Sequence, residues 1–236
     1  MNKVTFHGHA CFCIANDSHR IIIDPWLTGN LAADLTVEEV TDIDAVLVTH
    51  GHADHLGDTV AIAKKCDATV IAPFELATYC QHKGVKTHPM HIGGAYKFEF
   101  GRVKLIQALH GSGLPNDDGS ITYLGNPCGF LVEMGSKSYY HTGDTGLFGD
   151  MSLIKEWLEH GRKIDVMMLP IGDNFVMGPK DAFTAVRWVN PNIAIPMHYD
   201  TFPVIKQDAG AFKEQVENEL AFKCEVMQAG DTLTLD

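Results

Sequence analysis

The chain of 236 residues is long enough to bury one sizeable core, and its 45% hydrophobic and 20% charged residues are typical of a soluble globular protein. Its 18 Lys and Arg residues against 30 Asp and Glu residues give a formal net charge of −12. This balance argues against nucleic acid or an anionic membrane as the main partner. It does not exclude a small anionic substrate, because a bound metal ion would dominate the charge of its own site.

Features of membrane and secreted proteins are missing from the sequence. No apolar stretch approaches transmembrane length, and the first residues, MNKVTFHGHA, contain no signal-peptide core. The cysteines form no CxxC pair, which favours buried free thiols in a reducing compartment over disulfides. We therefore expect a cytoplasmic protein. The six cysteines are Cys11, Cys13, Cys66, Cys80, Cys128 and Cys224.

Short β-favouring runs dominate the N-terminal third. One continuous apolar run ends directly before His50, as expected for a strand buried on both faces. Gly84 marks the end of a predicted helix. The predicted strands are Val4–Phe6, Cys11–Ile14, Arg20–Asp24, Ala45–Thr49 and Thr69–Ala72, and the predicted helices are Leu56–Lys65 and Phe74–His82.

The middle of the chain is again rich in strands, and the last third alternates between helices and strands. The Gly-, Pro- and Asp-rich stretch Gly111–Gly119 is typical of a loop, and its place after His110 makes it a candidate substrate lid. The predicted strands are Tyr96–Phe100, Val103–Ala108, Gly129–Met134, Ser138–His141, Asp165–Leu169, Ile193–Pro196, Glu225–Gln228 and Thr232–Leu235, and the predicted helices are Met151–His160, Pro179–Val189 and one near Gln207–Leu220.

This order of elements predicts an α/β fold in which two β-sheets pack face to face with helices outside, as a sandwich of two similar halves. No linker, charge run or low-complexity segment divides the chain. We therefore expect a single domain over residues 1–236.

The strongest chemical signal is the string His50-Gly51-His52-Ala53-Asp54-His55. Three histidines and one aspartate lie within six residues, directly after the predicted buried strand Ala45–Thr49. Imidazole and carboxylate groups are ligands of Zn²⁺ and similar ions. On an extended loop His50 and His52 point the same way, whereas Asp54 and His55 at the start of a helix would serve a different metal. The string therefore predicts a metal site rather than an exposed histidine-rich loop.

The HxHxDH string resembles the signature of the metallo-β-lactamase superfamily, which implies a four-layer αββα sandwich with one or two metals at its edge. Further motif positions occur in the expected order at the ends of predicted strands. They are Asp24 in IIIDPWLTG, His110 in QALHGSG, Asp144 in HTGDTG and His198 in IPMHY. The strings THGHADHLGDT, HTGDTGLFGDM, LPIGDNFVMGP and IPMHYDTFPVI resemble the UPF0173 metal-dependent hydrolases, a family similar to the ascorbate-6-phosphate lactonase branch.

The resemblance implies two divalent metal ions, with Zn²⁺ expected and Mn²⁺ or Ni²⁺ as alternatives. A metal-bound hydroxide would then attack an ester, lactone or phosphodiester bond of a small-molecule substrate. Asp54 could be a ligand, the catalytic general base or both. The implied ligands are His50, His52 and His110 for one metal, Asp54, His55 and His198 for the other, and Asp144 as the bridge.

Five further residues are candidates for roles beside the metals. Asp24 is expected to orient a ligating histidine, although an aspartate is also common in a turn at this place. His7 and His9 could each be a further ligand, a substrate contact or an ordinary loop histidine. Asp173 and Asn174 follow a predicted strand, and could bind substrate, hydrogen-bond a ligand, or merely cap a helix or turn.

Two other functions compete with hydrolysis. One is an iron-dependent oxidoreductase or dioxygenase of the same fold, but the di-iron branch typically has a carboxylate where this chain has His52. The other is a binding protein that a metal merely stabilises, although structural zinc sites are usually closed and rich in cysteine. No basic and aromatic track for nucleic acid is visible. Members of the resembled family are often oligomers, so a homo-oligomer is compatible with the resemblance.

Overall fold

The computed structural model describes residues 1–158 and 162–236. These residues form two seven-stranded sheets and a separate two-stranded hairpin. The first sheet has the order β16-β1-β2-β3-β4-β5-β6, and the second has the order β15-β14-β13-β12-β11-β8-β7. The strands of the first sheet are β1 (Asn2–Phe6), β2 (Phe12–Ala15), β3 (Arg20–Ile23), β4 (Ala45–Leu47), β5 (Thr69–Pro73), β6 (Thr87–Met90) and β16 (Thr232–Leu235).

The two sheets follow the same plan. In the first sheet β16, β1, β2 and β3 pair antiparallel, and β3 to β6 pair parallel. In the second sheet β7, β8, β11 and β12 pair antiparallel, and β12 to β15 pair parallel. The described chain thus has the two similar halves predicted from the order of elements. The strands of the second sheet are β7 (Ala95–Phe98), β8 (Gly101–Gln107), β11 (Cys128–Met134), β12 (Lys137–His141), β13 (Val166–Pro170), β14 (Ile193–Met197) and β15 (Lys223–Cys224).

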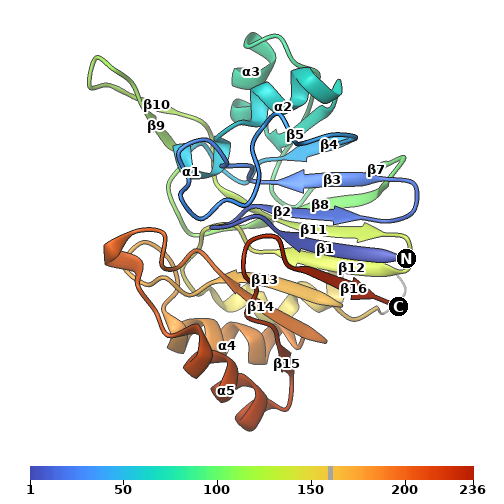
Figure 1. Cartoon of the computed structure of the whole chain (residues 1–236), viewed down its shortest axis with the longest axis vertical. Coiled ribbons are helices and arrows are strands. Elements are labelled where there is room, and N and C mark those ends of the chain that lie inside the picture. Colours follow the sequence, from blue (N-terminus) through green and yellow to red (C-terminus); the bar gives the residue numbers. More distant parts are fainter. Residues whose placement is uncertain (159–161) are drawn as a thin grey trace.

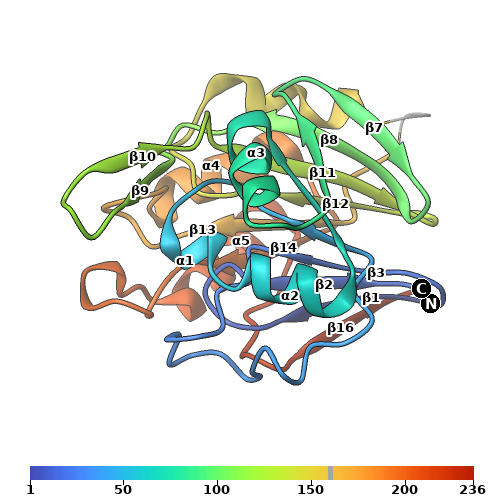
Figure 2. The ribbon, with the colours of Figure 1, turned by 90° about the horizontal axis from the view of Figure 1, so that it is seen from above.

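Helices cover the outer face of each sheet (Figures 1 and 2). α2 and α3 share a buried cluster with the first sheet, and η1, α4 and α5 share another with the second. The layers are therefore helix, sheet, sheet and helix, as the αββα expectation requires. The helices are α1 (Ala53–Leu56), α2 (Thr59–Cys66), α3 (Phe74–His82), η1 (Gly149–Trp157), α4 (Pro179–Val189), η3 (Pro203–Ile205) and α5 (Ala209–Leu220).

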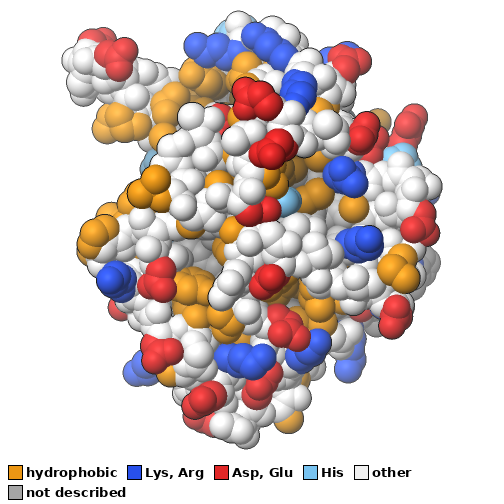
Figure 3. Space-filling model, in the orientation of Figure 1, with side chains coloured by type: hydrophobic (Ala, Val, Ile, Leu, Met, Phe, Trp, Pro, Cys, Tyr) orange, Lys and Arg blue, Asp and Glu red, His pale blue; other side chains and the backbone are white. Residues whose placement is uncertain are grey.

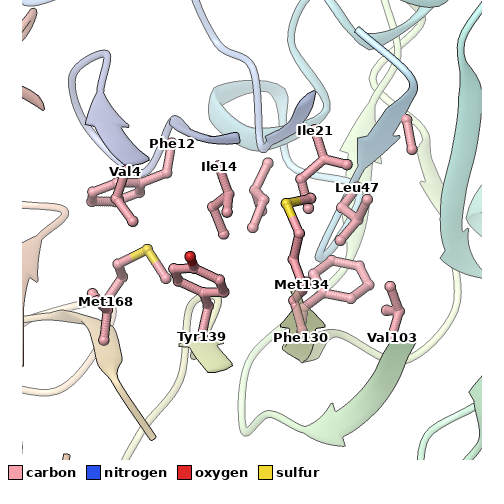
Figure 4. Close-up of a cluster of buried hydrophobic side chains, with 14 of the residues drawn as sticks. Val4, Phe12, Ile14, Ile21, Leu47, Val103, Phe130, Met134, Tyr139 and Met168 are labelled. Carbon is pink, nitrogen blue, oxygen red and sulfur yellow. The ribbon is translucent and has the colours of Figure 1, made fainter. Parts of the chain in front are cut away.

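The main hydrophobic core lies between the two sheets, where Phe12 and Leu47 of one sheet face Phe130 and Tyr139 of the other (Figure 4). Successive side chains of a strand point to opposite faces. Tyr139 accordingly joins this central core, whereas the equally buried Tyr140 joins the cluster under the outer helices. Burial on both faces explains why such strands are continuous apolar runs in the sequence.

One predicted helix is interrupted in the structure. The predicted helix Leu56–Lys65 is broken into α1 and α2 at Gly57, which has a φ of 37°. A Cβ at this position would lie 2.5 Å from the Pro25 carbonyl oxygen, so the packing of the chain against the helix requires glycine.

Other predicted elements also differ from the structure. The predicted loop Gly111–Gly119 contains β9 (Gly113–Pro115), which pairs with β10 (Ile121–Tyr123) as a hairpin. The predicted helix Met151–His160 is a 3₁₀ helix, and its C-terminal end lies outside the described residues. The predicted strand Glu225–Gln228 is irregular, because the pairing with β14 ends at Cys224. The sequence did not predict β6, because Pro89 is unusual within a strand. β6 lies at the edge of the first sheet, where proline is tolerated.

Both chain termini lie at one end of the sheets, where β1 pairs with β16 (Figure 1). The hairpin β9–β10 and α1 lie at the opposite end in both ribbon views. None of the helices in residues 1–158 and 162–236 has the length and apolar character needed to cross a membrane.

Candidate metal centre

The predicted ligands gather at the end of the sandwich that carries α1. They follow parallel-running strands whose carboxyl ends meet at one edge, which is where open α/β sheets place their sites. His50 follows β4, and Asp54 and His55 lie in α1, which begins three residues after His50. The second sheet supplies the other three, which are His110 after β8, Asp144 after β12 and His198 after β14.

Three histidines form the first cluster. His52 Nδ1 lies 3.0 Å from His50 Nε2 and 3.2 Å from His110 Nε2. Two imidazole nitrogens that share one tetrahedral zinc ion lie about 3.3 Å apart, given ordinary zinc–nitrogen bond lengths. The spacing of the three nitrogens therefore fits a common metal ion.

A second cluster contains His9, Asp54, His55 and His198, whose potential ligand atoms lie within 4.8 Å of one another. Asp144 lies between the clusters. Its Oδ2 is 2.9 Å from His198 Nε2 and 3.5 Å from His110 Nε2, and its Oδ1 is 3.3 Å from His55 Nε2. One carboxylate thus contacts residues of both clusters, which is the position that the resemblance implies for a bridging ligand.

Unpartnered polar atoms provide a test of whether a metal fits. Buried side-chain nitrogen and oxygen atoms are almost always hydrogen-bonded. In the described structure His55 Nε2, Asp144 Oδ1 and His198 Nε2 are buried, and although they lie 2.9–3.3 Å from an opposing side chain, none of them makes a hydrogen bond of acceptable geometry. They are two imidazole nitrogens and a carboxylate oxygen that face one another, the donor set that divalent metals prefer. The residues present therefore fit the group that the sequence predicts.

Asp24 orients the histidines of the ligand loop through hydrogen bonds. Its buried carboxylate accepts hydrogen bonds from Thr49 N at 2.8 Å and Thr49 Oγ1 at 2.7 Å, and lies 2.7 Å from His55 Nδ1. Thr49 Oγ1 is also 2.9 Å from His50 Nδ1. Each ring is therefore held through Nδ1 with Nε2 directed at the cluster, an arrangement typical of ligating histidines. Thr49 was not a predicted site residue, and its position next to His50 was the only available signal.

The two N-terminal histidines have different surroundings. His9 is buried, with Nε2 3.2 Å from Asp54 Oδ2 and Nδ1 2.6 Å from Thr201 Oγ1. Its ring packs 4.0 Å from that of His198, measured between centroids. His7 instead pairs with Asp34 at 2.9 Å and lines a separate groove on the first sheet. Of these two histidines, only His9 therefore belongs to the second cluster. Its backbone φ of 57° lies in the left-handed region.

Asp173 and Asn174 lie in an exposed turn between β13 and α4. Both have positive φ angles, of 60° and 46°, and Asn174 N donates to Asp173 Oδ1 at 2.9 Å. The contacts found for them are within this turn rather than with the clustered histidines.

Burial and mutual charge set the protonation of the cluster. Burial, followed by the charge of His55, holds the pKa of His50 well below its usual range, so His50 is a neutral imidazole ready to bind metal. Burial alone would lower the pKa of His55, but the carboxylates of Asp144 and Asp24 raise it well above normal. Burial would likewise raise the pKa of Asp144, but His198 and His55 hold it well below its usual range.

Comparison with known proteins identifies the family. Residues 19–199 match the beta-lactamase superfamily domain. A UPF0173 metal-dependent hydrolase of Heliobacterium modesticaldum is 52% identical over 236 residues, covering 100% of this chain and 98% of that protein. The chain belongs to the UPF0173 metal-dependent hydrolases. It is therefore an enzyme of the metallo-β-lactamase superfamily, and its two sheets flanked by helices are the fold of that superfamily.

Two solved structures share this fold at different levels of sequence identity. Igni18, a metallo hydrolase from Ignicoccus hospitalis KIN4/I, is 33% identical, with a TM-score of 0.87 and coverage of 100% of this chain and 98% of its own. CmlA, a diiron β-hydroxylase from Streptomyces venezuelae, is 14% identical, with a TM-score of 0.77 over 99% of this chain and 54% of its own. The latter likeness shows the fold alone, so the chemistry of a UPF0173 hydrolase has to be argued from its site.

Proposed function

We propose that this UPF0173 hydrolase uses two divalent metal ions, preferably Zn²⁺, to cleave an ester, lactone or phosphodiester bond of a small molecule. His50, His52 and His110 would hold one ion and Asp54, His55 and His198 the other, with Asp144 between them. The observation that carries the proposal is the group of buried, unpartnered atoms on His55, Asp144 and His198 beside the three-histidine cluster. When bound, two such ions lower the pKa of a water molecule and polarise the bond that it attacks.

Asp54 is the residue we assign to proton transfer. Its side chain is 25% exposed, compared with 3% for that of Asp144, so it alone of these two carboxylates borders open space. Burial raises the pKa of Asp54, but the hydrogen bond from His9 and the charge of His55 outweigh this effect and lower it below its ordinary value. Asp54 is therefore ionised at neutral pH and can accept a proton from the attacking water.

His9 positions that carboxylate. A neutral ring can donate from Nε2 to Asp54 Oδ2 while Nδ1 accepts from the Thr201 hydroxyl, which satisfies both observed contacts. Burial, followed by the charge of His198, lowers the pKa of His9 to about 4, in agreement with a neutral ring. The Thr201–His9–Asp54 chain thus fixes the orientation of Asp54.

Metal analysis combined with a substrate panel tests the proposal. We expect the purified protein to hold close to two equivalents of Zn²⁺, Mn²⁺ or Ni²⁺, and to act on a member of a panel of lactones, thioesters, β-lactams and phosphodiesters. His50→Ala should lose metal and activity, whereas the exposed His82→Ala should keep both. Absence of metal, with His50→Ala equal to wild type, would contradict the proposal. Iron together with oxygen consumption would favour the oxidoreductase alternative.

The remaining expectations accompany this proposal as predictions. They are a cytoplasmic location, a single domain over residues 1–236, a small-molecule substrate, no nucleic-acid or membrane partner, and compatibility with a homo-oligomer. The net charge of −12 supports the expectation about nucleic acid and anionic membranes.

A further inference from the structure

We infer that the substrate is an uncharged carboxylic ester or lactone with an apolar group, about the size of a phenyl ring, beside the scissile bond. This inference rests on the proposed function and narrows it. It starts from a cavity of about 510 Å³ that borders Asp54, a volume in the range of small-molecule sites. The cavity is lined by Trp26, Ala53, Asp54, Phe175, Phe202 and Val204.

The aromatic wall of this cavity touches the metal centre directly. The rings of Trp26 and Phe202 stack with their centroids 5.6 Å apart. His9 packs edge-on against both rings, at 5.1 Å from Trp26 and 5.6 Å from Phe202, while it contacts Asp54 on its other side. A substrate whose reacting bond lies at Asp54 would therefore place its neighbouring group against this wall.

Two hydrophobic side chains that line the cavity are largely exposed to solvent. Phe175 is 54% exposed and Val204 is 55% exposed. Figure 3 shows hydrophobic side chains on the left of the molecule, below the protruding hairpin β9–β10, and others spread over the same face. Phe175 follows Asp173 and Asn174, two successive non-glycine residues with positive φ, which is uncommon. Turns of this kind concentrate at ligand sites, which agrees with the position of Phe175 at the cavity.

The charge of the cavity selects between the bonds that the metal centre could cleave. Among the described residues, its lining contains one carboxylate, Asp54, and neither Lys nor Arg. Proteins bind phosphate chiefly through Arg, Lys and backbone amide groups. The proposed metal ions could face a phosphate at the scissile bond, but the cavity beside them offers its other oxygens, or a further phosphate group, only Asp54 and an apolar wall. A neutral acyl group would instead gain free energy by burying apolar surface there.

Matched chromogenic substrates test this inference in the metal-loaded enzyme. We expect kcat/KM for p-nitrophenyl phenylacetate to exceed that for p-nitrophenyl acetate by at least about tenfold, after division by the spontaneous rates. Phe175→Ala should reduce this preference by about two- to tenfold. Phe74→Ala is the matched control, since Phe74 is 48% exposed and lies at the start of α3, outside the cavity. A higher kcat/KM for bis(p-nitrophenyl) phosphate than for the phenylacetate ester would overturn the inference.

A binding measurement separates this inference from the proposed function. The ketone 4-phenyl-2-butanone cannot be hydrolysed, and it should change the tryptophan fluorescence through Trp26 in both metal-loaded and metal-free protein. Phe175→Ala should weaken its binding and Phe74→Ala should not. If wild type cleaves none of the substrates, the proposed function fails, and ketone binding decides whether the cavity is an apolar site. If wild type cleaves esters but Phe175→Ala keeps the same preference and ketone affinity, the inference alone fails.

Discussion

The two sheets share one plan of strands but contribute to the metal centre in different ways. The first sheet supplies His50, His52, Asp54 and His55 from a single loop between β4 and the end of α1. The second sheet supplies one residue from each of three separate strand ends, His110, Asp144 and His198. Each proposed metal would therefore be held by residues of both sheets, so metal binding should tie the two halves together.

The support behind the ligands differs as well. In the first half Asp24 and Thr49 orient both His50 and His55 through short hydrogen bonds. In the second half, by contrast, His198 Nδ1 is buried and makes no hydrogen bond within the described residues. The backbone joins the halves beside the site where His198 N donates to the His9 carbonyl at 2.8 Å and Cys128 N donates to the Thr49 carbonyl at 3.0 Å. Hydrogen bonds to Nδ1 thus orient His50 and His55 of the first half, whereas none orients His198 in the described structure.

The largest effect is expected at the residue that contacts both clusters. Asp144→Ala removes the carboxylate between them, so both metals should be lost and activity should fall by at least about 10³-fold. Metal analysis and turnover of the preferred substrate measure the effect. Asp150→Asn, at an exposed aspartate of the same half, should change neither. Retention of two equivalents by Asp144→Ala would show that the other proposed ligands hold both metals without the carboxylate between them.

Removing one ligand of the second sheet at a time should separate the two metals. We expect His110→Ala and His198→Ala each to lose about one of two equivalents, because each contributes to a different cluster. Metal content and thermal unfolding with and without a chelator provide the measurement. Simultaneous loss of both metals in each variant would mean that the two sites fill cooperatively through Asp144.

The contact between the halves at His9 predicts a pH dependence of stability. Its pKa is about 4 in the folded protein against an ordinary value of 6.5, so between these values the unfolded chain binds more protons. Stability of the metal-free protein should therefore fall as the pH drops from 6.5 to 4. His9→Asn should reduce this loss by about 2–3 kcal/mol, judged from the size of the shift. Denaturant unfolding at several pH values measures it, and an unchanged pH dependence would contradict the assignment.

His7→Asn is the matched control for that experiment. His7 lies two positions away and pairs with Asp34 outside the cluster, so its variant should keep the pH dependence of wild type. It should also keep the metal content and the activity.

A smaller effect is expected at Asp24, whose carboxylate contacts His55 of the first sheet's loop. Asp24→Asn keeps the size of the side chain but removes the charge that faces His55 Nδ1, and metal affinity should fall by about 10–100-fold. Competition with a chromophoric chelator measures the affinity. An affinity equal to that of wild type would show that the loop positions His55 without Asp24.

The sequence by itself determined the half of the site that is local. Because the string from His50 to His55 is contiguous and follows a buried strand, its convergence needs no knowledge of distant contacts. The order of strands also predicted the two sheets, since burial on both faces leaves a continuous apolar run. The resemblance extended this reading to His110, Asp144 and His198, and the structure brings all three to the loop.

Only the tertiary structure decided what depends on packing between distant segments. It separated His9 from His7, placed Thr49 beside the ring of His50, and brought Trp26, Phe175 and Phe202 to one cavity. Three aromatic side chains from three separate loops carry no joint pattern in the sequence, because nothing local marks their proximity. The ligand loop could be predicted from its chemistry and the distant ligands from the family resemblance, whereas the shape and charge of the space beside them depend on how the two sheets meet.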